Sequence, residues 1–253
     1  MDVPTGSLVL PAHAKLNLDL EVLGPRSDGH HEVRTRLQAV SLHDLLAIEV
    51  AAKTTLECGT GDDDLVLRAQ RALEAAASRP LPARFRLVKR IPAGAGLGGG
   101  SADAAAALRG LRRLYSLDLD LAPVAAGLGA DVPFLLAGGS AVATGRGERL
   151  APAQVARGWF ALAWPGLEVP TSAVYRTWDA VGGEGVNQLT RAAVAIRPEL
   201  AEFSGMLGEG WRMTGSGSAF FRPCHTRGEA ERSVEALPCW TAVTRPVRAW
   251  GAG

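Results

Sequence analysis

Four stretches in the N-terminal half are apolar or alternate apolar and polar residues, as β-strands do. The stretches are residues 14–22, 32–40, 45–57 and 84–89. Asp44 lies between the second and the third, where we expect it to end a strand. In the first stretch Lys15, Asn17, Asp19 and Glu21 share one face, because successive side chains of a strand point to opposite sides. On spacing alone, this face is either the solvated surface of an edge strand or a row of functional side chains.

Apolar residues three and four positions apart predict helices elsewhere in the chain. The predicted helices cover residues 65–77, 123–128, a segment from 131 and a segment from 171. Asp131 is an expected N-cap, and either Thr171 or Ser172 is expected to cap the helix that begins there.

A glycine-dense loop follows the fourth strand and leads into an alanine-rich helix. Five glycines lie between residues 94 and 100, and Ser101 is the expected N-cap of the helix. Glycine permits positive φ and a close approach of backbone N–H groups to a ligand, and the helix start adds partial positive charge. The loop is therefore predicted to bind an anion, for which phosphate is the usual candidate.

A dinucleotide site, a Walker loop and a flexible linker each fit this glycine-dense segment less well. GAGLGG matches the dinucleotide fingerprint, but Asp118 and Asp120, the acidic residues at about the right distance, follow the helix directly and close no convincing second strand. The Walker pattern fails, because no lysine followed by serine or threonine comes after the glycines. A flexible linker rarely leads into a capped helix.

The composition narrows the range of partners. The chain of 253 residues is long enough for one large domain or two small ones, and 27 Lys and Arg almost balance 26 Asp and Glu. Without a net basic field, we expect no binding of nucleic acid or of an anionic membrane. The N-terminus has no basic region followed by an apolar core, and no apolar run approaches the roughly eighteen residues of a membrane span.

The cysteine and histidine residues predict neither a disulfide framework nor a zinc site. Cys58, Cys224 and Cys239 are odd in number and lack a CxxC spacing. His30 and His31 are adjacent, and adjacent strand residues point to opposite faces, so a shared metal is disfavoured. A reducing, cytoplasmic location fits these features best.

Three motifs resemble those of the GHMP kinases, a family that includes galactokinase and the homoserine, mevalonate and phosphomevalonate kinases. PAGAGLGGGSADAAAAL at residues 92–108 resembles the ATP-binding signature, and GADVPF (129–134) and GSGS (215–218) resemble the other two motifs, in the same order. The triple glycine, together with AKLNLDLEVLG at residues 14–24, is most similar to one branch, the 4-diphosphocytidyl-2-C-methyl-D-erythritol kinases.

The resemblance covers nearly the whole chain and implies a two-domain α+β fold, with a helix over residues 187–203. Residues 1–152 would form the N-terminal GHMP kinase domain, similar to the second domain of ribosomal protein S5, and residues 153–253 a ferredoxin-like C-terminal domain. The implied reaction is ATP-dependent phosphorylation of the 2-hydroxyl of 4-diphosphocytidyl-2-C-methyl-D-erythritol, in the non-mevalonate route to isoprenoid precursors, with Mg²⁺ as cofactor.

The resemblance also implies catalytic and ATP-binding residues. Lys15 and Asp131 occupy the catalytic positions: Asp131 would accept the proton of the substrate hydroxyl, and Lys15 would stabilise developing charge. Taken alone, Asp131 is equally well explained as a helix cap. Ser101 and Asp103 are candidate contacts for Mg²⁺. The implied ATP-binding residues are Pro92, Ala93, Gly94, Ala95, Gly96, Leu97, Gly98, Gly99, Gly100, Ser101 and Ala102.

The implied substrate-binding residues are Asn17, His30, His31, Thr171, Tyr175, Gly215 and Ser216. His31 takes the position of a family histidine that helps hold the cytosine ring, whereas His30 stands where the family commonly has tyrosine. Imidazole can still stack on the base, but over a smaller area than phenol. Thr171 and Tyr175 would contact the other face of the base.

Other functions remain open from the sequence. One is another GHMP small-molecule kinase, of the homoserine or mevalonate type, although the glycine loop and the DGHHE and PTSAVY segments favour the cytidyl substrate. Another is a non-catalytic nucleotide-binding protein, against which the joint presence of Lys15 and Asp131 argues. A dehydrogenase is the most distant alternative, and bound NAD would reveal it.

Overall fold

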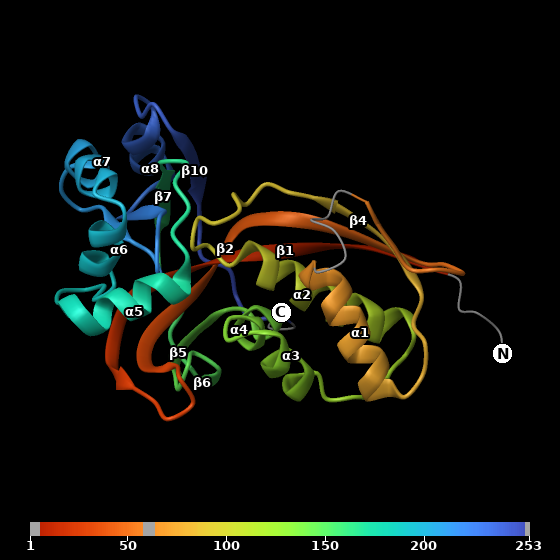
Figure 1. The fold of residues 1–253 in the computed structure, drawn as a ribbon. Coiled ribbons are helices and arrows are strands. Elements are labelled where there is room, and N and C mark those ends of the chain that lie inside the picture. The colour runs from red at the N-terminus through yellow and green to blue at the C-terminus, as the bar shows by residue number, and fades with distance from the viewer. Residues whose placement is uncertain (1–5, 58–63, 251–253) are drawn as a thin grey trace. The chain divides into compact units, whose positions relative to one another are not determined.

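The computed structural model describes residues 6–57 and 64–250 (Figure 1). Cys58 and Asp62 lie outside this part of the chain. The strands are β1 Ser7–Pro25, β2 His31–Val50, β3 Thr55–Glu57, β4 Ala83–Val88, β5 Ser140–Thr144, β6 Arg149–Pro152, β7 Trp159–Trp164, β8 Arg212–Met213, β9 Phe220–Cys224 and β10 Trp240–Thr244. The helices are α1 Leu65–Ala77, α2 Gly99–Leu114, α3 Ala122–Leu128, α4 Val132–Ala137, α5 Thr171–Val181, α6 Thr190–Ile196, α7 Glu199–Leu207 and α8 Arg227–Val234. No helix within the described residues is long and apolar enough to cross a bilayer.

The chain divides into two compact units built from interleaved segments. The first comprises Met1–Ala14, His43–Ile91 and Gly98–Ala137, and the second comprises Lys15–Leu42, Pro92–Leu97 and Gly138–Gly253. The long strands β1 and β2 contribute residues to both. The expected domain boundary after residue 152 stays a prediction.

The first unit contains helices α1 to α4 and the strand segments that pair with β4. β4 pairs antiparallel with the second part of β2 and parallel with β3. Helices α1 and α2 lie side by side, and α2 also packs against α4 (Figure 1). Ala104–Ala107 of α2 are completely buried, and a Cβ at Gly110 would stand 2.2 Å from Cδ1 of Ile48 in β2. The small residues thus let the helix lie directly on the strand.

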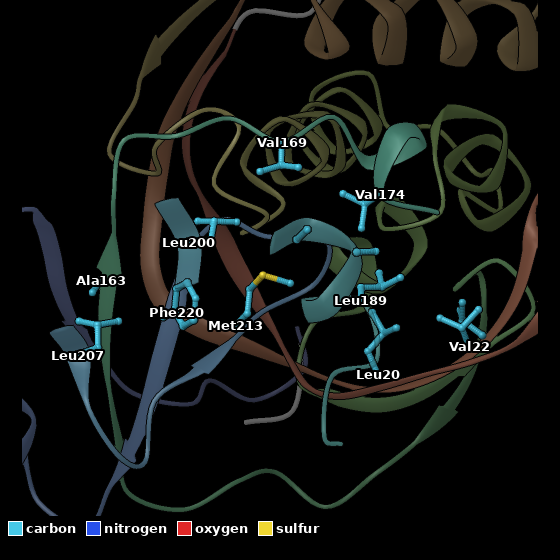
Figure 2. Packing of buried hydrophobic residues seen from close by; sticks show 13 residues of the cluster. Leu20, Val22, Ala163, Val169, Val174, Leu189, Leu200, Leu207, Met213 and Phe220 are labelled. Atoms are coloured by element: carbon cyan, nitrogen blue, oxygen red, sulfur yellow. The ribbon is translucent and has the colours of Figure 1, made fainter. Parts of the chain in front are cut away.

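The second unit contains a four-stranded antiparallel sheet in the order β10-β7-β9-β8, together with helices α5 to α8. The first part of β2 pairs with β5, and β5 pairs with β6. One hydrophobic cluster contains apolar side chains of β1 together with side chains of this sheet and its helices (Figure 2). Leu20 and Val22 come from β1, Leu189 precedes α6, and Phe220 lies on β9. Each such side chain contributes about 1.5–3 kcal/mol when fully buried.

Three predicted elements differ from the structure. Strand β2 continues through Asp44, because the Asp44 carboxylate is buried and accepts hydrogen bonds there, including one from the backbone N–H of Ile91. The single strand predicted over residues 45–57 is divided between the end of β2 and β3, and residues 51–54 lie outside both. The single helix predicted over residues 187–203 is two helices, α6 and α7, separated at Pro198, since proline cannot continue a helical hydrogen-bond ladder. The other predicted helices and strands are present near their expected positions.

Candidate active site

Lys15 and Asn17 form a buried hydrogen-bonded pair on β1. The Lys15 ammonium Nζ donates to Oδ1 of Asn17 at 2.6 Å, and the residues are only 5% and 6% exposed. Asp19 and Glu21, farther along the same face, are more accessible. A solvated strand face therefore does not describe Lys15 and Asn17. A buried polar group needs a partner, and here each side chain provides one for the other.

The first part of the glycine loop, Pro92–Leu97, belongs to the same unit as this pair. The backbone N–H of Lys15 donates to the carbonyl of Leu97 at 3.0 Å, so the loop follows β1 at the candidate lysine. The backbone N–H of Ala219 donates to the carbonyl of Ala95 at 3.0 Å. The first and third motifs, far apart in the sequence, thus meet beside β1.

Two glycines allow this close approach. Gly96 has φ of +78°, and a Cβ there would stand 2.5 Å from the carbonyl oxygen of Gly217. Gly215 has φ of +59°, and a Cβ there would lie 3.2 Å from Nζ of Lys15. Any larger residue would be strained at either position and would crowd its neighbours. Gly215 therefore brings the third motif close to the lysine.

His31 and Tyr175, both predicted to contact the substrate base, stack on each other in the second unit. Their ring centroids are 5.0 Å apart with an interplanar angle of 25°. The Nε2 atom of His31 lies 2.7 Å from Oδ1 of Asp179, one helical turn after Tyr175 on α5, so both helix residues reach the same histidine. Trp178 packs edge-on against the His31 ring at 5.9 Å.

His30 lies in a different environment. Its side chain is 55% exposed, and its Nδ1 atom lies 3.2 Å from the carbonyl oxygen of Asp28 in the same turn. The structure therefore brings His31 to Tyr175 but leaves His30 at the surface. A role for His30 in binding the base stays a prediction.

Thr171 does not cap α5, although the sequence predicts a cap at Thr171 or Ser172. Pro170 occupies the N-cap position, and Thr171 is the first residue of the helix. The Thr171 hydroxyl instead lies 2.9 Å from the hydroxyl of Ser216 in the third motif. Two predicted substrate-binding residues from distant parts of the chain are thereby adjacent.

The second part of the glycine loop opens α2 in the first unit. Gly98, with φ of +75°, is the N-cap, so the expected cap at Ser101 was wrong and Ser101 lies in the first turn. A glycine in the left-handed region offers no side chain to the helix start. The first backbone N–H groups of α2 therefore keep the unsatisfied donor capacity that suits an anion.

Asp131 lies in the first unit, directly before α4. Its carbonyl accepts from the backbone N–H of Leu135 at 3.1 Å, which places it at the N-cap position of this short helix, as predicted. Lys15 and Asp131 are located in different units. Their pairing in catalysis stays a prediction.

Three charged side chains hold the two ends of the glycine loop together in the first unit. Nζ of Lys89, at the end of β4, donates to Oδ2 of Asp44 at 2.5 Å and to Oδ2 of Asp103 on α2 at 2.7 Å. Asp44 also accepts from the backbone N–H of Arg90 at 2.5 Å and from that of Ile91 at 2.8 Å. We call Asp44, Lys89 and Asp103 the loop clamp. The sequence signal that could have revealed the loop clamp is a carboxylate inside a largely apolar strand.

Burial has the largest effect on the pKa of Asp103. Desolvation raises the pKa of its carboxyl to about 7, although Lys89 opposes this rise. Burial alone would lower the pKa of Lys89, but the charges and hydrogen bonds of Asp103 and Asp44 outweigh it and raise that pKa. Asp103 therefore faces Lys89, and this pairing argues against the expectation that Asp103 contacts Mg²⁺.

The expected use of Mg²⁺ stays a prediction. Within the described residues, no group of three or more His, Cys, Asp or Glu could hold a metal. Mg²⁺ often takes most of its oxygen ligands from phosphates and water. The Ser101 hydroxyl, in the first turn of α2, remains the candidate protein ligand.

Comparisons with known proteins agree with this geometry. The family of GHMP kinases N terminal domains matches residues 64–139. A 4-diphosphocytidyl-2-C-methyl-D-erythritol kinase of Thermus thermophilus is 40% identical over 253 residues, covering 90% of this chain and 92% of the relative. A crystal structure of a 4-(cytidine 5'-diphospho)-2C-methyl-D-erythritol kinase has a TM-score of 0.82 and 39% identity, covering 94% of this chain and 99% of that one. A homoserine kinase from Cytophaga hutchinsonii, with a TM-score of 0.60 and 16% identity over 96% of this chain and 95% of its own, shows the fold alone.

These matches confirm the α+β GHMP kinase fold that the three motifs predicted. The difference in identity between the two solved structures, 39% against 16%, places this chain with the cytidyl branch. The chain belongs to the 4-diphosphocytidyl-2-C-methyl-D-erythritol kinase family of the GHMP kinases.

Proposed function

We propose that this chain transfers the γ-phosphoryl group of ATP to the 2-hydroxyl of 4-diphosphocytidyl-2-C-methyl-D-erythritol, giving the 2-phosphate and ADP. The reaction belongs to the non-mevalonate route to isoprenoid precursors. The observation that carries the proposal is the family membership, supported by a buried lysine whose backbone is bonded to the glycine loop at Leu97. Phosphoryl transfer depends mainly on positioning and charge stabilisation, which such an arrangement supplies.

The start of α2 would bind the phosphates of ATP. Its first backbone N–H groups follow Gly98 and are joined by the positive end of a 16-residue helix. Mg²⁺, when bound, would neutralise charge on the β- and γ-phosphate oxygens, and Ser101 would be its protein ligand. The loop clamp would hold the loop ends in place without contacting the phosphates.

Asp131 and Lys15 would act on the substrate hydroxyl. Asp131, directly before α4, would accept the proton from this hydroxyl as the general base. Lys15 would stabilise the negative charge that develops during transfer. Asn17 holds the Lys15 ammonium and would border the same hydroxyl.

The cytidyl end of the substrate would be bound around His31 and Tyr175. These two rings stack directly on each other at 5.0 Å, so the base would lie against an outer face of the pair and not between them, which differs from the arrangement that the resemblance implies. Asp179 holds the His31 ring in this position. Thr171 and Ser216 add two adjacent hydroxyls. The proposed partners are thus small molecules, and we propose the cytoplasm as the place of the reaction.

A direct assay tests the substrate. The purified protein would be incubated with Mg·ATP and each of three acceptors, the cytidyl compound, homoserine and mevalonate, while ADP release is followed. ADP formed only with the cytidyl compound supports the proposal. Turnover with homoserine or mevalonate alone would overturn the substrate, and no turnover with any of the three would overturn the proposed reaction.

Two variants test the catalytic roles. Lys15→Ala and Asp131→Ala should each lower turnover at least about 100-fold, with little change in nucleotide affinity measured by calorimetry. Asp120→Ala is a matched control, because Asp120 is also an aspartate at a helix start, where it accepts from the N–H of Ala122 at 3.0 Å. Asp120→Ala should turn over normally. Normal turnover in either site variant would refute the role assigned to that residue.

A further inference from the structure

Thr35 touches the Lys15–Asn17 pair from a neighbouring strand. It is a buried residue of β2, in the part of the strand that pairs with β5. Its hydroxyl oxygen Oγ1 lies 2.9 Å from Nδ2 of Asn17 and 2.5 Å from the backbone carbonyl oxygen of Asp19. All of these residues belong to the second unit.

The hydrogen-bonding capacity of a hydroxyl fixes the direction of these contacts. A threonine hydroxyl has one proton, and the Asp19 carbonyl can only accept, so the proton of Thr35 is donated to Asp19. Thr35 must then accept from Asn17, which requires the NH₂ side of the Asn17 amide to face it. The other side of the amide, Oδ1, is consequently turned to the Lys15 ammonium, as the 2.6 Å contact requires.

The backbone of Asn17 is held independently of its side chain. Its N–H donates to the hydroxyl of Thr214, a completely buried residue, at 2.8 Å. With the main chain fixed in this way, the remaining freedom of Asn17 is rotation of its amide. Thr35 removes that freedom.

We propose that Thr35 is a positioning residue for the phosphoryl transfer, because it locks the Asn17 amide in the orientation that holds the Lys15 ammonium. The inference rests on the proposed function, in which Lys15 stabilises the developing charge. Without the Thr35 hydroxyl, the amide of Asn17 can turn and present NH₂ to an ammonium, which places two donors against each other. Lys15 then leaves its position while the fold stays intact.

Three variants test the proposal through turnover. Thr35→Val keeps the shape but removes the hydroxyl, and it should lower kcat about 10- to 100-fold with KM for ATP within about 2-fold. Thr35→Ser keeps the hydroxyl and should retain kcat within about 3-fold. Thr244→Val is the matched control, because Thr244 is also buried and its hydroxyl accepts from the N–H of Leu42 at 2.9 Å. It should lose stability but not kcat. Wild-type kcat in Thr35→Val would overturn the proposal.

A double-mutant cycle separates positioning from a general structural role. If Thr35 acts through Asn17, adding Thr35→Val to Asn17→Ala should lower kcat no further. Additive losses would overturn the proposal, because they would mean that Thr35 acts without the amide. This comparison also stays informative if Thr35→Val is less stable than the wild type.

A measurement without substrate keeps the inference distinguishable from the proposed function. The side-chain NH₂ protons of Asn17, assigned in NMR spectra by their loss in Asn17→Asp, should exchange slowly with water in the wild type and in Thr35→Ser. They should exchange faster in Thr35→Val. Equal exchange in all three would overturn the inference even if the enzyme is active, whereas the expected pattern would support the locked amide even if the assayed substrate proved wrong.

Discussion

The two units of the molecule each hold a lysine, by different means. In the first unit, Lys89 lies between two buried carboxylates, those of Asp44 and Asp103. In the second unit, Lys15 is bonded to the neutral amide of Asn17, which a second neutral group, the Thr35 hydroxyl, holds in turn. Lys89 is thus held by two carboxylates, whereas the Asn17 amide and the Thr35 hydroxyl are neutral groups.

This difference predicts whether each network affects stability or turnover. A buried charge costs free energy unless an opposite charge compensates it. Removal of one member of the loop clamp should therefore lower the free energy of unfolding. Neutral groups cost less to bury, and a flipped amide changes the position of one side chain rather than the fold. We therefore expect changes in the loop clamp to lower the free energy of unfolding, and changes around Asn17 to lower turnover.

The largest effect should come from Lys89→Met. It leaves the carboxylates of Asp44 and Asp103 buried without their counter-ion, and it should lower the free energy of unfolding by about 3 kcal/mol, measured with denaturant at pH 8. This loss of stability is at the low end of the range usual for a broken buried ion pair. The Lys89 side chain is 35% exposed, so water can partly replace it.

Two further variants check the cause of that loss. Arg84→Met removes an exposed partner of Glu49 on the same strand as a matched control, and it should change stability by no more than about 0.5 kcal/mol. Adding Asp103→Asn to Lys89→Met should recover part of the loss, since one buried charge disappears. If the double variant were no more stable than Lys89→Met, uncompensated charge could not be the reason.

The next effect is a pH dependence of stability caused by Asp103. The pKa of this carboxyl is about 7 in the folded chain, above its ordinary value of 3.8. Between these values the folded chain binds a proton that the unfolded chain has released, so the free energy of unfolding falls as pH rises. From pH 5 to pH 7.5, we expect this residue to lower it by about 2 kcal/mol.

Asp103→Asn isolates this contribution. The variant has no carboxyl to titrate, and its unfolding free energy should fall less over the same pH range than that of the wild type. The difference between the two curves, from denaturant titrations at several pH values, measures the effect. Parallel curves would show that Asp103 ionises normally in the folded chain and that its burial is compensated by Lys89 alone.

The features that could be predicted from the sequence are local in the chain. The helix that ends at Ala77 follows from its periodicity, and the structure shows Asp64 as its N-cap, accepting from the N–H of Val66 at 2.9 Å. The three motifs identify the family because each is a short run of consecutive residues. In the loop, for example, the glycines that its backbone conformation requires lie close together in the sequence. Lys15 and Asn17 were named for the same reason.

The features that could not be predicted depend on partners far apart in the chain. Asp44 and Lys89 are 45 residues apart, and Asn17 and Thr35 are 18 apart, so no spacing rule links them. Ser101 was a good cap by residue type, but Gly98 began the helix one turn earlier because it tolerates positive φ. Propensity selects suitable residues, and tertiary contacts decide among them.

Asp179→Asn gives the smallest expected effect and is the sharpest test of the comparison, because Asp179 is a charged residue in the same unit as the neutral Asn17 amide and Thr35 hydroxyl. Its carboxylate can only accept, so it keeps a proton on Nε2 of His31. Asparagine can accept or donate, so it no longer fixes a proton on that nitrogen. Since Asp179 is 46% exposed, we expect only a 2- to 5-fold rise in KM for the cytidyl substrate, with kcat and stability nearly unchanged.

Steady-state kinetics and denaturant unfolding of the same samples would decide this case. Glu231→Gln, which removes a similarly exposed charge paired with Arg227 at 2.8 Å, is the control and should change neither KM nor kcat. A rise in KM without loss of stability would mean that location in the site, rather than charge, determines what a residue does. A loss of more than about 2 kcal/mol in stability would mean that charge itself is decisive, because an exposed pair should contribute less than that. The contrast between the loop clamp and the Lys15 network would then reflect charge alone and not their roles in binding and transfer.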